Sequence, residues 1–174
     1  MEEVKGRRSI PKFVGSDHIK TVTIEERIAV FLYSQETPFI SLGDKNRSWY
    51  GAMRVETSDD KWREELTTLL QDSTAIICIP GAFEGTLWEV NHIIEKYNHK
   101  SIFVMPPSSY NEDSLLKLDI KLHWESARAS TSDTENIKFP DYEEPGMLIQ
   151  VNNDGHTSIS EYDDLIERLD DIIS

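Results

Sequence analysis

The sequence predicts a three-layer α/β domain with a mainly parallel β-sheet. Short apolar segments alternate with amphipathic helical patterns along the chain, which is the order expected of parallel strands joined by right-handed crossovers. The segment Ala75–Ile79 is apolar throughout and rich in Ile, as is typical of a central strand covered on both faces. A length of 174 residues also fits one domain with one core.

The chain begins with a segment that shows no periodic pattern. Residues 1–20 combine charge with proline and glycine, so we expect an N-terminal arm or the remnant of a first strand. Residues 21–174 are expected to form the α/β domain. Thr23 and Glu26 have the spacing of a capping box, which predicts a helix over residues 24–35.

A strand and two helices are predicted next. Pro38–Gly43 is short, apolar and closed by glycine, which favours a buried strand that ends in a functional loop. Ser58–Asp60 predicts the start of a helix, which carries apolar residues at helical spacing: Trp62, Leu66, Leu69 and Leu70. After Ala75–Ile79, residues 86–98 predict another helix with the stripe Leu87, Val90, Ile94 and Tyr97. We expect Ala75–Ile79 to lie between parallel strands near Phe39 and Phe103.

The C-terminal part predicts a strand, a helix, a hairpin and a last helix. Ser101–Met105 is a strand pattern, and residues 111–123 predict a weaker helix. Residues 124–146 are polar, which indicates a surface excursion. Residues 147–159 predict a hairpin around Asn153-Asp154-Gly155. Ser160 is expected to cap a final helix with Leu165, Ile166, Leu169 and Ile172 on one side.

The charge balance excludes some classes of partner. Asp and Glu total 32 against 18 Lys and Arg, and the resulting net charge of -14 repels nucleic acid and anionic membrane surfaces. No apolar stretch approaches the roughly 20 residues of a membrane span, so we expect a cytoplasmic chain without membrane contact. The single cysteine, Cys78, lies in an apolar run and is expected to be a buried, inert thiol. The histidines lack ligand spacing, so no metal is expected.

The loop after the strongest predicted strand leads to the main candidate residue. Glu89 follows this loop and is expected in the first turn of the next helix, to one side of its apolar stripe. A carboxylate there can stabilise or attack an oxocarbenium-like centre during cleavage of an N-glycosidic bond, or bind ribose hydroxyls. The helix dipole alone also favours a glutamate in a first turn.

A series of short motifs resembles the bacterial TIR-like domains, which are often attached to transmembrane helices. The motifs span residues 23–107 in the following order: Thr23-Ile24-Glu25-Glu26, Pro38-Phe39-Ile40-Ser41-Leu42-Gly43, Gly51-Ala52-Met53-Arg54, Asp59-Asp60-Lys61-Trp62, Gly85-Thr86-Leu87-Trp88-Glu89 and Phe103-Val104-Met105-Pro106-Pro107. The Gly85-Thr86-x-x-Glu89 piece is also similar to the nucleoside 2-deoxyribosyltransferase superfamily and to the TIR NADases. The resemblance implies a flavodoxin-like fold and a catalytic role for Glu89.

The residues and the resemblance together predict a nucleotide-directed N-glycosidase or NAD hydrolase in bacterial signalling or defence. It would need no cofactor, and NAD or another nucleotide would be its substrate. Besides Glu89, the expected substrate-binding residues are Ser41, Gly43, Arg54, Phe83, Gly85, Thr86 and Trp88. Several have simpler interpretations: Trp88 as a packing residue, Gly85-Thr86 as an ordinary helix start, and Arg54 in a surface ion pair. Asp59 or Asp60 is either a helix cap or a second catalytic carboxylate. The alternative function is a non-catalytic module that binds a nucleotide, a second copy of itself or another TIR-like domain.

Overall fold

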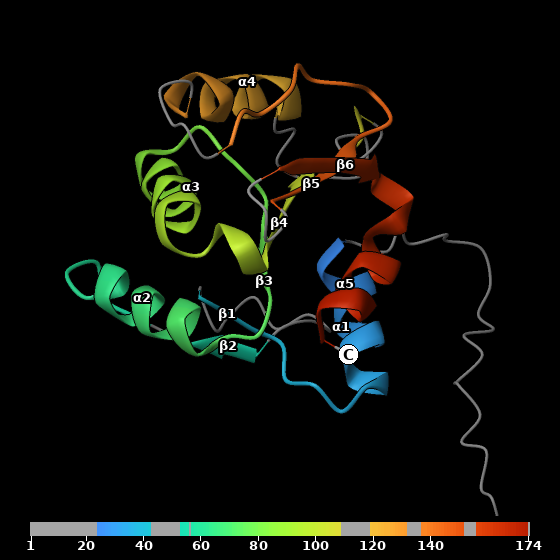
Figure 1. Ribbon diagram of the computed structural model, residues 1–174. Coiled ribbons are helices and arrows are strands. Elements are labelled where there is room, and N and C mark those ends of the chain that lie inside the picture. Colours follow the sequence, from blue (N-terminus) through green and yellow to red (C-terminus); the bar gives the residue numbers. More distant parts are fainter. Residues whose placement is uncertain are drawn as a thin grey trace, which may run out of the picture.

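The computed structural model describes residues 24–42, 53–55, 57–108, 119–131, 137–151 and 156–173. The arm predicted for residues 1–20 and the cap predicted at Thr23 lie outside these ranges. Figure 1 shows helices on both sides of a central sheet. The described elements are α1 (Ile24–Ser34), β1 (Ile40–Leu42), β2 (Met53–Val55), α2 (Trp62–Asp72), β3 (Ile76–Cys78), α3 (Glu84–Lys96), η1 (Asn98–Lys100), β4 (Ser101–Met105), α4 (Ile120–Ser130), β5 (Met147–Val151), β6 (Thr157–Glu161), η3 (Tyr162–Asp164) and α5 (Leu165–Ile173).

The main sheet has the strand order β3-β4-β5-β6 and is mostly antiparallel. β3 and β4 run parallel, as predicted, but β4 pairs with β5 and β5 with β6 in antiparallel fashion. The prediction of a mainly parallel sheet is therefore wrong. Met105, the last residue of β4, lies opposite Met147, the first residue of β5. The chain therefore returns to the sheet at the same end of the strands at which it left. The predicted hairpin is confirmed, because Val151 at the end of β5 pairs with Thr157 at the start of β6.

β3 is an edge strand among the described residues, because β4 is its only neighbour there. The expected neighbour near Phe103 is confirmed, and the expected neighbour near Phe39 is wrong. β1 instead pairs in parallel with β2, Ile40 lying opposite Met53, in a separate sheet. The sequence predicted no strand at β2. In the structure, β2 forms backbone hydrogen bonds with one side of β1.

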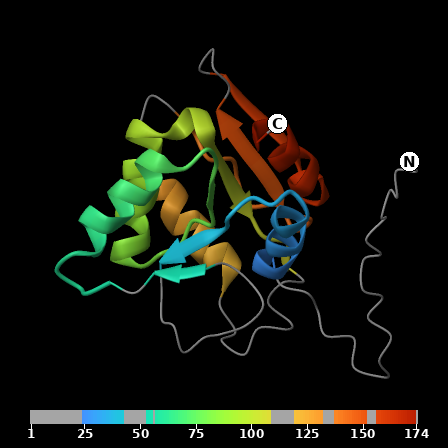
Figure 2. The ribbon, with the colours of Figure 1, turned by 90° about the horizontal axis from the view of Figure 1, so that it is seen from below.

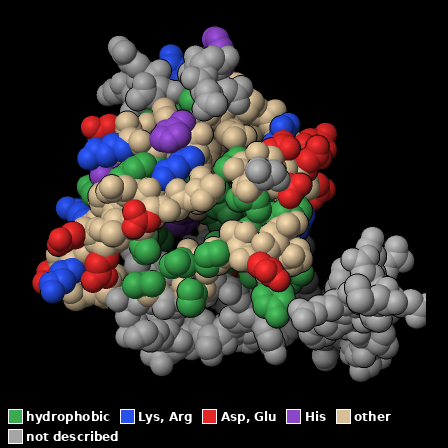
Figure 3. Space-filling model, turned by 60° about the horizontal axis from the view of Figure 1, so that its bottom comes forward, with side chains coloured by type: hydrophobic (Ala, Val, Ile, Leu, Met, Phe, Trp, Pro, Cys, Tyr) green, Lys and Arg blue, Asp and Glu red, His purple; other side chains and the backbone are tan. Residues whose placement is uncertain are grey.

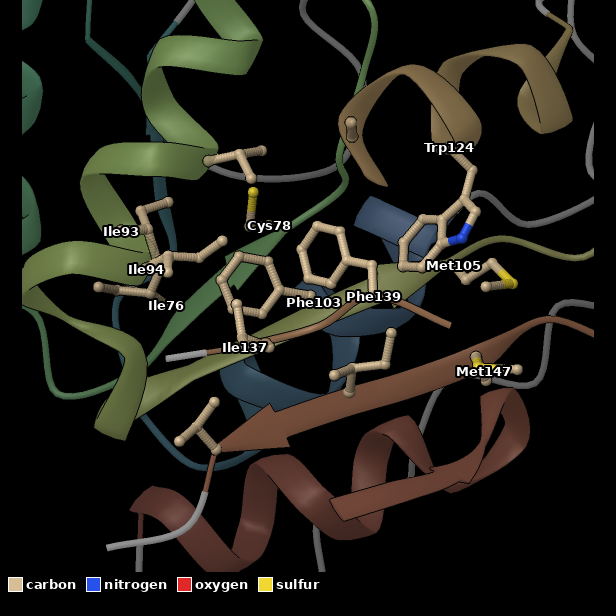
Figure 4. Close-up of a cluster of buried hydrophobic side chains, with 14 of the residues drawn as sticks. Ile76, Cys78, Ile93, Ile94, Phe103, Met105, Trp124, Ile137, Phe139 and Met147 are labelled. Atoms are coloured by element: carbon tan, nitrogen blue, oxygen red, sulfur yellow. The ribbon is translucent and has the colours of Figure 1, made fainter. Parts of the chain in front are cut away.

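The larger hydrophobic core lies between the sheet and the helices α2, α3 and α4. Phe103 and Met105 of β4 point into it and are fully buried. Figure 4 shows the ring of Phe139 between the ring of Phe103 and the indole of Trp124. The ring centroids of Phe103 and Phe139 are 5.1 Å apart, and those of Trp124 and Phe139 are 4.9 Å apart.

A second core covers the opposite face of the sheet. Ile102 and Val104 alternate with Phe103 and Met105 along β4 and point to this side, as successive residues of a strand must. Here they pack against α1 and α5, through buried residues of the two helices: Ile24, Ile28, Leu32, Leu165 and Leu169. In Figure 2, α1 and α5 lie together on one side, away from α2 and α3. Within the described ranges, no helix has the length and apolar character needed to cross a membrane.

The segment predicted as a surface excursion is in part core. Residues 120–130 form α4, and only the last residues of the helix predicted over 111–123 belong to it; residues 109–118 lie outside the described part. Trp124 is 1% exposed, and its indole N–H donates to the carbonyl of Pro140 at 2.9 Å. Ile137 and Phe139 are also buried. The polar composition of this stretch concealed the few apolar residues that anchor it.

Two predicted helix starts also need correction. α3 begins at Glu84 rather than at Thr86, so Gly85 and Thr86 are helical. Ser160, the predicted cap of the last helix, lies within β6 instead. A 3-10 turn, η3, follows this strand, so α5 begins only at Leu165.

Candidate functional site

The loop after β3 connects three elements around Gly81. A side-chain carbon at Gly81 would lie 3.2 Å from Cγ2 of Thr86 in α3 and 3.5 Å from Nδ1 of His123 in α4. Contacts this close leave little room for any residue larger than glycine. The C-terminal end of β3, the first turns of α3 and the first turns of α4 therefore meet at this loop.

Glu89 lies on the inner side of α3, in its second turn. The first turn begins at Glu84, so the sequence placed Glu89 one turn too early. Ile93, four residues further on the same side of the helix, is 4% exposed. Glu89 is itself half-buried, although a solvated carboxylate would be expected at an exposed helix position. Compensation of the helix dipole, which acts in the first turn, does not account for its position.

Burial raises the pKa of Glu89 above the ordinary range of a glutamate. Within the described ranges, no hydrogen bond or ion pair compensates its charge, so desolvation dominates. The negative charge of Glu89 also contributes to the raised pKa of Cys78, although burial of the thiol is the larger cause. Glu89 therefore lies within electrostatic range of the C-terminal end of β3. The prediction that Cys78 is buried is confirmed, and a thiol so strongly held in its neutral form is a poor nucleophile.

His123 is a residue of this loop region that the sequence did not indicate. The backbone N–H of Ala82 donates to its Nδ1 at 3.0 Å, and its ring lies 5.2 Å from the ring of Phe83. Asp119 caps α4 by accepting from the N–H of Leu122, which places His123 in the first turns of that helix. The contact joins residues 41 positions apart, so no local pattern could have revealed it.

Trp88 packs between α2 and α3. Its ring lies 5.1 Å from Trp62 in an edge-to-face arrangement and 4.7 Å from His92 in a stacked one. The guanidinium of Arg63 covers both indoles, at 5.2 Å from Trp62 and 5.1 Å from Trp88. These contacts support the packing interpretation of Trp88. Gly85 also faces this cluster, because a side-chain carbon there would lie 3.8 Å from the Trp62 ring.

Ser41 and Arg54 are partners in the short parallel pair of β1 and β2. Their side chains, and all of Gly43, lie outside the part of the chain that the structure describes. In Figure 1, β1 and β2 lie at the lower end of the molecule, whereas α4, which the loop after β3 contacts, lies at the upper end. The structure therefore does not bring the backbone of Ser41 and Arg54 to the loop that contains Phe83. Figure 3 shows the lower face, where hydrophobic side chains border a hollow.

The remaining candidates have ordinary surroundings. Asp59 and Asp60 are exposed in the turn before α2, and a hydrogen bond from Ser58 is the main cause that lowers the pKa of Asp60. Phe83 is 65% exposed at the loop after β3. Among the described residues, no group of three His, Cys, Asp or Glu side chains is arranged to hold a metal ion. Comparisons of the chain with protein-family models, curated proteins and solved structures found no match.

Proposed function

We propose that the chain is a nucleotide-directed N-glycosidase of the NAD hydrolase type, with Glu89 as its catalytic residue. The observation that carries this proposal is the half-buried Glu89 carboxylate, whose pKa burial raises and which no described partner compensates. Perturbed carboxylates of this kind are concentrated at functional sites, because they cost stability wherever they serve no purpose. The motif resemblance to TIR-like domains points to the same residue.

The chemistry follows from the position of one carboxylate beside the end of β3. Cleavage of an N-glycosidic bond leaves positive charge on the anomeric carbon of the ribose. A carboxylate removed from water stabilises such a cation more strongly than a solvated one, because its charge is not screened. Glu89 would face the ribose and either stabilise the cation or form a bond with the anomeric carbon, before water completes the hydrolysis.

The test compares two glutamates of the same helix. Purified protein is incubated with NAD and with a panel of nucleosides, at low and at high protein concentration, and release of the free base is measured by chromatography. We expect Glu89→Gln to abolish release, and Glu84→Gln, which changes an exposed residue of the first turn of α3, to leave it intact. Equal activity of the Glu89→Gln variant and the unchanged protein would remove Glu89 from the mechanism.

A non-catalytic binding module is the second candidate. Phe83 and Leu122 are 65% and 59% exposed on the two elements that meet at the loop, and exposed apolar side chains favour contact with a ligand or partner. This function predicts nucleotide binding, or self-association, without release of a free base at any protein concentration. Calorimetry with NAD and sedimentation of the concentrated protein would detect it.

A further inference from the structure

The hydrogen bond from Ala82 to His123 restricts the chemistry of the imidazole ring. A backbone N–H can only donate, so Nδ1 of His123 must accept and must lack a proton. In the neutral ring the proton is then on Nε2. The loop after β3 thus selects one of the two neutral tautomers of His123.

The second nitrogen of His123 has no role in the fold as described. His123 is half-buried, and its Nε2 makes no hydrogen bond to any residue in the described ranges. The bond to Ala82 and the contact with the Phe83 ring, 5.2 Å away, hold the imidazole in place. The ring therefore offers one oriented N–H donor. The same loop also connects His123 to the helix that carries Glu89, because Gly81, the residue before Ala82, packs against Thr86 of that helix.

We propose that His123 is a ligand-binding residue of this site, whose Nε2–H donates a hydrogen bond to an oxygen of the bound nucleotide. The inference rests on the proposed function, because it takes the ligand of Glu89 as its acceptor. An uncharged N–H suits a ribose hydroxyl or a base carbonyl, which need a donor without a full positive charge. His123 contributes orientation and affinity and takes no part in bond breaking.

Two amide variants separate the two nitrogens of the ring. His123→Asn can retain an acceptor for the Ala82 N–H but lacks a donor at the Nε2 position. His123→Gln extends an amide N–H toward the Nε2 position, and His123→Phe removes both groups while keeping a ring. His99→Phe is the control, because His99 is exposed in η1, which precedes β4 and lies at the opposite end of the strands.

Steady-state kinetics of base release from NAD give KM and kcat for each variant. NMR of the Ala82 amide and of the His123 ring nitrogens shows which ring nitrogen carries the proton. We expect KM to rise roughly 2- to 13-fold in His123→Asn and His123→Phe, as for loss of one neutral hydrogen bond. We expect partial recovery in His123→Gln, no change in His99→Phe, and an unprotonated Nδ1 in the unchanged protein. An unchanged KM in His123→Phe, or a proton on Nδ1, would overturn the role of His123 alone. Failure of the unchanged protein to bind or cleave NAD and the nucleosides would overturn both this inference and the proposed function.

Discussion

Replacement of Trp124 by alanine tests the packing that holds α4 on the sheet. The indole is 1% exposed, lies 4.9 Å from the ring of Phe139, and donates its N–H to the Pro140 carbonyl at 2.9 Å. Removing a buried tryptophan costs about 3–5 kcal/mol through lost burial and the cavity left behind. For a chain of this size, the midpoint of thermal unfolding should then fall by roughly 6–20 °C.

The measurements are thermal and urea unfolding, both followed by far-UV circular dichroism, because this signal does not depend on the removed fluorophore. Trp124→Phe keeps a ring against Phe139 but loses the hydrogen bond, and is expected to cost about 1–3 kcal/mol. Leu122→Ala is the matched control, because Leu122 lies in the same helix and is 59% exposed; its cost should stay below about 0.5 kcal/mol. A Trp124→Ala variant as stable as Leu122→Ala would refute the placement of α4 and of residues 137–140 in the core.

Three further predictions use the same unfolding assay. Gly146→Ala should destabilise the fold by roughly 2–4 kcal/mol, because Gly146 has φ 75° and a side-chain carbon would lie 2.6 Å from the Met105 carbonyl oxygen; a neutral result would contradict this backbone course. Asp119→Ala should cost about 1 kcal/mol through loss of the α4 cap, with Asp119→Asn close to the unchanged protein. Burial raises the pKa of Glu89 in the folded protein, so the folded state favours the protonated carboxyl. Protonated Glu89 therefore adds stability at low pH, and this stability is lost as pH rises from about 4.3, the pKa of an unfolded glutamate, through the folded pKa. Glu89→Gln should abolish that loss and be at least as stable at pH 7 as the unchanged protein; a less stable variant would show that the carboxylate supports the fold.

The elements that the sequence predicted well are those with strong local patterns. The strand at Ser101–Met105 has its predicted bounds, because an uninterrupted apolar run ends at two prolines. The hairpin of β5 and β6 followed from its turn residues. The pairing of strands was predicted less well, because a run of apolar residues indicates burial on both faces and carries no information on direction. Antiparallel pairing of β4 with β5 depends on the path of residues 106–146.

That path was hidden because few residues determine it. Ile120, Trp124 and Ala127 have the spacing of a buried helical stripe, but polar residues surround them. Ile137 and Phe139 alternate in the manner of a strand, yet they belong to an irregular segment that Trp124 contacts through the Phe139 ring and the Pro140 carbonyl. Contacts between two such segments are non-local, so composition averaged over the stretch predicted a surface excursion.

The same distinction explains why the sequence indicated Glu89 and missed His123. Glu89 belongs to a helix that directly follows a strong strand, so its place near the end of β3 follows from chain order. His123 reaches that place only because Trp124, the next residue, anchors α4 in the core, where Nδ1 of His123 accepts the hydrogen bond that the Ala82 N–H donates. If α4 did not pack there, the imidazole would be an ordinary solvated side chain. The candidate site therefore depends on the core contact that the Trp124→Ala variant removes, and that variant should lose the NMR signature of the Ala82–His123 hydrogen bond before it loses the sheet.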